Sequence, residues 1–134
     1  MRTHFNPKNN PRVIIIQKLY GKFYNEDNDL DFPKHRFKKF IKDIVLGTIE
    51  RNDLIISELD TKLGNEFVFE NLDKVFQTIL KAATYEFLYK PNVSINIIIK
   101  EYLNSSNFFL ENSQTKYLNA LLDNIGKKLR SNNA

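Results

Sequence analysis

The apolar residues of this chain recur at steps of three and four, and this spacing constrains the fold more than any other feature. Between residues 34 and 63 they form a stripe that a helix would place on one face, whereas a strand would need strict alternation. The stripe contains Phe37, Phe40, Ile41, Ile44, Val45, Thr48 and Ile49, and it continues with a change of phase from residue 54 to 63. We expect Gly47 or segment 51–53 to bend or break this long helix, and Gly64 to end it.

The same period predicts three further helices in the second half of the chain. Asp73 precedes the first of them, and Pro91 ends it because proline lacks an amide hydrogen and disfavours a helical residue before it. Ser94 is a suitable N-cap for the next helix. Asn112 or Ser113 is expected to cap the last one.

The run VIII at residues 13–16 is β-branched and, taken alone, also suits a buried strand. Its context favours a helix, because Asn10 is a favoured cap and Pro11 is favoured at the first helical position. A lone strand would have no partner among helices, and β-branched residues cost a helix only a few tenths of a kcal/mol each. The sequence therefore predicts an all-α, compact helical domain of about six or seven helices.

The chain has 134 residues, which suits a single domain over residues 1–134. The basic segment 1–9 and the tail 131–134 are polar, and we expect both to be flexible. The sequence has no cysteine, no signal-like segment and no apolar stretch of membrane-spanning length. These features predict a cytoplasmic protein with no membrane partner.

The net charge of +4 is modest, but the cations are clustered. Residues 1–24 contain five cations and no acid, residues 34–42 contain five more and no acid, and an acidic segment lies between them. Clustered cations favour a polyanionic partner such as RNA, with a merely solvated face as the alternative.

Motifs for catalysis are lacking. The two histidines, His4 and His35, belong to no metal-binding pattern, the four glycines form no phosphate-binding loop, and cysteine chemistry is impossible. We therefore expect no catalytic residues, no metal, no cofactor and no enzymatic activity.

Several blocks stand in a fixed order along the chain, among them IQKLY at residues 16–20, TILKAATYEF at 78–87 and SQTKYLNALLD at 113–123. These ordered blocks resemble the NusB family of bacterial transcription antitermination factors over nearly the whole chain. IQKLY is similar to the family's V-Q-x-L-Y, TILKAATYEF to A-I-L-R-x-A-x-Y-E-L, and SQTKYLNALLD to D-S-x-K-F-V-N-G-V-L-D. The matching segments are residues 16–20, 45–56, 78–87, 90–94 and 113–123.

The resemblance implies two packed helical bundles and a non-enzymatic role in transcription antitermination. It implies binding to the boxA element of ribosomal RNA leader transcripts together with NusE, a small-subunit ribosomal protein, in assemblies with other Nus factors and RNA polymerase. Two alternatives remain open: a NusB-like RNA- or protein-binding module without an antitermination role, and the NusB-like domain found at the front of ribosomal RNA cytosine methyltransferases. The oligomeric state is also open, with a homodimer as one alternative.

Mapped onto this chain, the family's basic arm R-R-R-x-R falls on residues 8–12, where only Lys8 and Arg12 are basic. The cations would hold phosphates, Gln17 would read a base edge or hold the arm, and Tyr117 would stack on a base. Arg2 and the run 34–42 are candidates to replace the missing arginines. The expected RNA-binding residues are Lys8, Arg12, Gln17, Lys18, Lys116, Tyr117 and Asn119.

Overall fold

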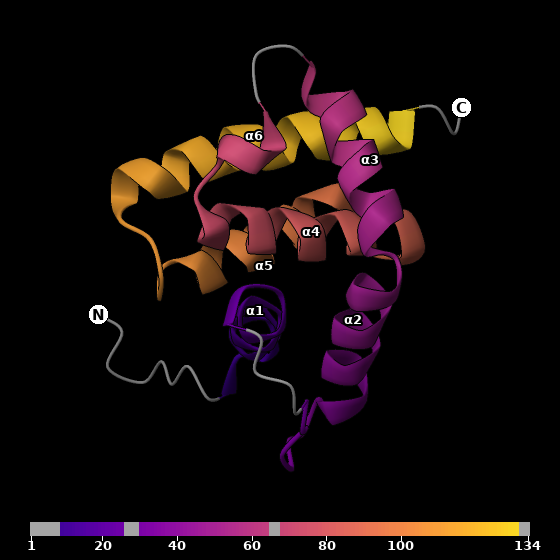
Figure 1. Ribbon diagram of the computed structural model, residues 1–134, viewed down its shortest axis with the longest axis vertical. Coiled ribbons are helices and arrows are strands. Elements are labelled where there is room, and N and C mark those ends of the chain that lie inside the picture. Colours follow the sequence, from indigo (N-terminus) through magenta and orange to yellow (C-terminus); the bar gives the residue numbers. More distant parts are fainter. Residues whose placement is uncertain (1–8, 26–29, 65–67, 132–134) are drawn as a thin grey trace.

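A computed structural model describes residues 9–25, 30–64 and 68–131, and helices form most of the structure in these ranges (Figure 1). A π-helical turn, η2 (Gly21–Asn25), follows α1, and a short 3₁₀ turn, η4 (Phe69–Asn71), precedes α4. The described ranges contain no strand, which confirms the all-α prediction and makes the VIII run part of α1. The α-helices are α1 (Pro11–Tyr20), α2 (Lys38–Glu50), α3 (Asn52–Leu63), α4 (Lys74–Tyr89), α5 (Ile95–Ser106) and α6 (Asn112–Ser131).

Three of the predicted helix starts are confirmed by side-chain caps. The Asn10 side chain accepts hydrogen bonds from the first amides of α1, Asp73 accepts one in α4, and Ser94 accepts one in α5. The start predicted for α6 is wrong by one or two residues. That helix already begins at Asn112, because the side chain of Gln114 reaches back and accepts a hydrogen bond from the amide of Glu111.

The long stripe of residues 34–63 is divided between two helices. Helix α2 continues through Gly47 and ends at Glu50, and α3 begins at Asn52. Arg51, with φ −103° and ψ 22°, forms the break between them. The predicted interruption is therefore confirmed within segment 51–53 and not at Gly47.

Helix α4 lies at the centre of the fold and packs against all the other α-helices. Every residue from 76 to 87 is buried, including polar ones. In Figure 1, α1 and α2 lie below α4, and α6 crosses above it. Helices α4 and α5 contact both of these groups, so one continuous apolar core runs through the described residues. Among the same residues, no helix is both long and apolar enough to span a membrane.

Candidate RNA interface

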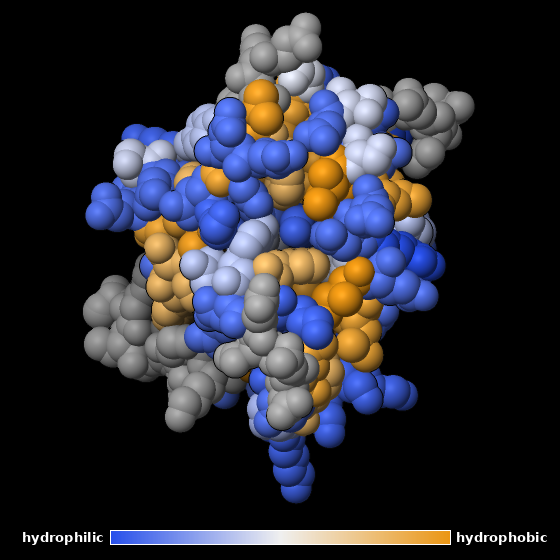
Figure 2. Space-filling model, viewed as in Figure 1, coloured by the Kyte–Doolittle hydropathy of each residue, from blue (hydrophilic) through white to orange (hydrophobic). Residues whose placement is uncertain are grey.

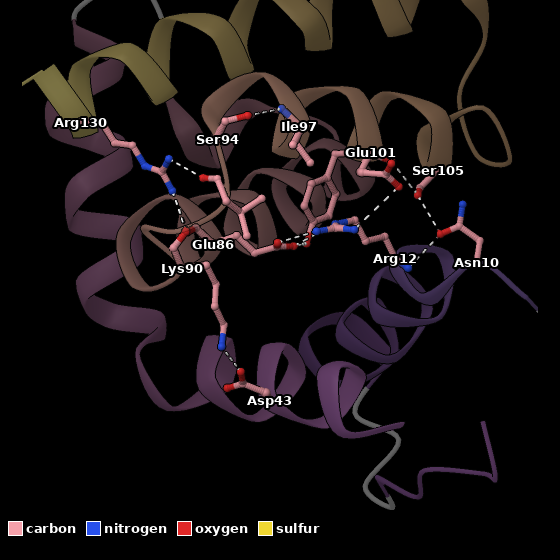
Figure 3. Close-up of polar contacts among 12 residues, drawn as sticks. Asn10, Arg12, Asp43, Glu86, Lys90, Ser94, Ile97, Glu101, Ser105 and Arg130 are labelled. Atoms are coloured by element: carbon pink, nitrogen blue, oxygen red, sulfur yellow. Dashed lines mark hydrogen bonds and ion pairs between the residues drawn. The ribbon is translucent and has the colours of Figure 1, made fainter. Parts of the chain in front are cut away.

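Arg12, the second cation of the predicted basic arm, points into the protein. Only 8% of its surface is exposed, and its Nε and Nη2 donate to the two carboxylate oxygens of Glu86 at 3.0 and 2.6 Å (Figure 3). Glu86 is fully buried and also accepts a hydrogen bond from the hydroxyl of Tyr102. The guanidinium therefore forms a paired, buried network that joins α1, α4 and α5.

Further contacts surround the same guanidinium. The Glu101 carboxylate lies 3.8 Å from Nη1, and the ring centroids of Phe40 and Tyr102 lie 4.9 and 5.3 Å from Cζ. Burial, followed by the charge of Glu86, raises the pKa of Tyr102 well above its ordinary value, so this hydroxyl remains a hydrogen-bond donor. For the phosphate contact expected from Arg12, a phosphate would have to compete with Glu86 and Glu101 for this guanidinium.

The network and the N-cap together fix where α1 begins. The Asn10 side-chain oxygen accepts from the amide of Arg12 at 2.9 Å and also from the hydroxyl of Ser105 in α5, at 3.2 Å. The start of α1 is therefore attached to α5 as well as to α4. Lys8 precedes this point and lies outside the described residues.

Gln17 is exposed on α1 and borders a groove of about 350 Å³. Its walls come from α1, from η2, from the first turn of α4 and from the segment between α5 and α6. The groove is lined by Ile16, Gln17, Tyr20, Gly21, Asn25, Val75 and Phe109. An amide side chain beside a partly apolar hollow can offer both donors and an acceptor to a base edge.

The three α6 residues predicted from the resemblance are all exposed. Lys116 and Asn119, three residues apart, lie on one face of the helix, and Tyr117 is 39% exposed. The Tyr117 ring meets the ring of Phe76 edge-on, with centroids 5.5 Å apart. Phe76 follows Val75, which lines the groove at Gln17, so the first turn of α4 connects the α1 and α6 parts of the candidate interface.

Lys18 lies at the surface next to Gln17. Its ammonium is 3.3 Å from a carboxylate oxygen of Asp31, whose side chain is 86% exposed. Such a surface pair is worth at most about 1 kcal/mol, so a phosphate could compete for this lysine.

One unusual lysine was missed by the sequence reasoning. Lys81 is 4% exposed, and its ammonium lies 3.7 Å from the centroid of Phe23, 5.4 Å from that of Tyr24 and 5.9 Å from that of Phe69. Burial lowers the pKa of Lys81 to about 8. Burial also raises the pKa of the neighbouring Tyr24 to about 12, and the charge of Tyr20 adds a smaller contribution to that increase. The only sequence signal was a lysine inside the apolar run of α4.

Among the described residues, no three or more histidine, aspartate or glutamate side chains form a group that could hold a metal ion. The exposed side chains of the candidate interface are instead amides, ammonium groups and an aromatic ring. These groups suit binding of a single-stranded nucleic acid.

Comparison with known proteins identifies a family for this architecture. The model of the NusB family matches residues 9–127. A transcription antitermination protein NusB from Sphingopyxis alaskensis is 33% identical over 91 residues, which are 68% of this chain and 61% of the relative. The NusB protein of Maricaulis maris is 27% identical over 113 residues, covering 75% of this chain and 71% of its own length.

A solved structure shows the same fold. T. maritima NusB superposes with a TM-score of 0.76 and covers 92% of both chains, at 21% sequence identity. The two proteins therefore share a helical arrangement although their sequences are only 21% identical.

Proposed function

The chain belongs to the NusB family of transcription antitermination proteins, and we propose that it binds a boxA-like element of ribosomal RNA leader transcripts together with NusE. In this proposal the complex joins other Nus factors and RNA polymerase in the cytoplasm and supports ribosomal RNA transcription. The chain acts by binding and has no enzymatic activity.

The proposal rests on the arrangement of exposed groups around the first turn of α4. Val75 of this turn lines the groove beside Gln17, and Phe76 of the same turn packs against Tyr117. An amide beside a hollow and an exposed aromatic ring can hold two unpaired bases, one by hydrogen bonding and one by stacking. Lys116 and Asn119 add a cation and a polar group on the exposed side of α6.

The remaining predicted residues divide into cations that would hold phosphates and one arginine that positions α1. Lys8, Lys18 and Lys116 would neutralise phosphates, while Arg12 positions the first turn of α1 through Glu86. Because each neutralised phosphate contributes about −0.7 to the salt slope on single strands, three lysines give a log–log slope of about −2.

Fluorescence titration of a boxA-containing RNA, at several salt concentrations and with and without NusE, tests this proposal. Tyr117→Ala should weaken binding by about 10-fold, because stacking is worth about 1–3 kcal/mol per base, and Tyr117→Phe should restore it. Leu54→Ala is a matched control, since Leu54 is 48% exposed on α3. Absence of RNA binding by the unaltered protein, even with NusE, would refute the function. Retained NusE binding in that case would favour a purely protein-binding module.

A further inference from the structure

The second basic run of the sequence forms a charged surface where α2 begins, here termed the α2 basic face. All five of its cations are exposed. Within the described part of the chain, none of them forms an ion pair. The α2 basic face consists of Lys34, Arg36, Lys38, Lys39 and Lys42.

The charges of this face are unfavourable within the molecule itself. Lys38 and Lys39 occupy the first turn of α2, where the helix dipole disfavours cations, and that turn contains no acid. Lys38 and Lys42 are like charges four residues apart on the helix, which also destabilises it. The next acid, Asp43, pairs with Lys90 and accepts a hydrogen bond from Tyr85. An external anion would relieve this repulsion.

An exposed aromatic ring accompanies the cations. Phe37 is 40% exposed and directly precedes α2. The guanidinium carbon of Arg36 lies 5.1 Å from its ring centroid, and the ring of His35 lies 5.9 Å away. Cations around an exposed aromatic ring suit single-stranded nucleic acid, because the ring can stack on a base while the cations hold phosphates.

The α2 basic face adjoins the start of α1, where the predicted basic arm enters the fold. The ring of Phe40 in α2 lies 4.9 Å from the guanidinium of Arg12, and Ile14 of α1 lines a small cavity together with Lys38. Figure 1 shows α1 and the start of α2 together in the lower part of the molecule, and Figure 2 shows hydrophilic side chains projecting at this lower end. The start of α1 and the α2 basic face therefore lie side by side.

We propose that the α2 basic face is a second contact surface for the phosphate backbone of the same single-stranded RNA, so that the bound strand continues past the start of α1 onto α2. Phe37 then offers a stacking position to an unpaired base. This inference rests on the proposed RNA-binding function and adds a site that compensates for the sparse arm.

The salt dependence of RNA binding separates this surface from the first interface. With three further phosphate contacts, from Lys38, Lys39 and Lys42, the slope of the unaltered protein should be about −4 instead of about −2. The probe is a fluorescent single-stranded RNA that carries boxA with unpaired nucleotides on both sides. The triple variant Lys38→Gln, Lys39→Gln, Lys42→Gln should lose about two units of slope, and Phe37→Ala should weaken binding without changing the slope.

A charge-matched control comes from the opposite end of the protein. Lys62, Lys127 and Lys128 lie near the ends of α3 and α6, where the Lys128 ammonium donates to the Lys62 carbonyl at 2.9 Å. Replacing these three with Gln removes the same charge and should leave the RNA slope unchanged. Circular dichroism of both triple variants verifies that the helices remain folded.

Each outcome has a distinct meaning. If the unaltered protein binds no RNA, the proposed function fails and the α2 site fails with it. If the unaltered protein binds RNA and both triple variants show the same salt slope as the unaltered protein, the α2 site is refuted while the function stands. Equal losses in the two triple variants would indicate a general charge effect and also refute the site. Loss of NusE binding by the α2 variant, with RNA binding intact, would assign this surface to a protein partner and overturn the inference.

Discussion

Replacing Glu86 with glutamine perturbs the buried network without changing the shape of the side chain. The carboxylate accepts two hydrogen bonds from Arg12, at 3.0 and 2.6 Å, and one from Tyr102. Removing one partner of a buried ion pair typically costs about 3–5 kcal/mol because the other charge is left uncompensated. Glu101 and two aromatic rings still attract the guanidinium, so we expect about 3 kcal/mol, at the lower end of that range.

A double variant separates the network energy from simple side-chain loss. In Arg12→Met, Glu86→Gln the charge is gone, and the carbonyl oxygen of the new amide at position 86 can still accept from Tyr102. Uncharged replacements of buried pairs are often neutral or stabilising. We therefore expect the double variant to be less destabilised than either single variant, with a coupling energy of about 2 kcal/mol or more.

Urea denaturation followed by circular dichroism measures these differences. For a slope m of about 2 kcal/mol per molar, the Glu86→Gln midpoint should fall by about 1.5 M. A loss below about 1 kcal/mol, or additive effects of the two substitutions, would contradict the network. Either result would mean that water or another group compensates Arg12 after the change.

Three other predictions concern single residues. Between about pH 8 and 9.5 the wild-type protein should gain stability relative to Lys81→Met, because the unfolded lysine stays protonated while the folded one, with a pKa of about 8, releases its proton. After allowance for solvent screening, we expect this gain to be about 1 kcal/mol. Urea titrations of both proteins at each pH measure it. Gly47→Ala should lower the stability measured by thermal unfolding by about 1–3 kcal/mol, because the new Cβ would collide with the Tyr85 ring. Gly21→Ala is the control: position 21 is helical, and a Cβ there meets no atom within 4 Å, so this change should be neutral or slightly stabilising. Arg130→Lys should lower the free energy of unfolding, measured in urea, by about 2 kcal/mol. Arg130 donates to four carbonyls at the end of α4 and in the following turn, at 2.6 to 3.4 Å, and a lysine cannot reproduce the planar fork of the guanidinium.

Helix positions were predictable because they depend on local sequence. Asn10, Asp73 and Ser94 could be identified as caps from the residue itself and its neighbours, since a cap bonds amides two or three residues away. The break at Arg51 was predicted only as a range. The start of α6 was misplaced, because it depends on Gln114 reaching back to Glu111 rather than on the residue types at 112 and 113.

Burial of polar residues was not predictable from the helical period. A single apolar stripe predicts one buried face, but α4 is surrounded by the other helices, so Gln77 and Lys81 are buried as well. Gln77 accepts from the hydroxyl of Tyr24 at 2.6 Å and donates to the carbonyl of Leu72 at 2.8 Å. Tyr24 belongs to η2 and is 53 residues away in sequence, so this contact follows from the tertiary packing.

The charge of the basic arm illustrates the same limit at the candidate site. Counting cations along the sequence groups Arg12 with Lys8, whereas the structure pairs Arg12 with Glu86, which lies 74 residues away. A carboxylate inside an apolar helix was the available signal that a buried partner was needed. The family resemblance assigned Gln17 and Tyr117 individually, and both side chains are exposed, while their roles in RNA binding stay predictions.

The position of Arg12 allows its direct and indirect roles in RNA binding to be distinguished. If Arg12 acts only by fixing the start of α1, the Arg12→Met, Glu86→Gln variant keeps an uncharged, packed α1 start, and its RNA salt slope should match that of the unaltered protein. If the guanidinium instead leaves Glu86 to hold a phosphate, the salt slope of this double variant should be less negative by about 0.7, and its affinity for RNA at low salt should fall. Glu86→Gln then serves as the control, because it frees the guanidinium and should tighten RNA binding only in the second case. The buried geometry, with both carboxylate oxygens engaged, favours an unchanged slope.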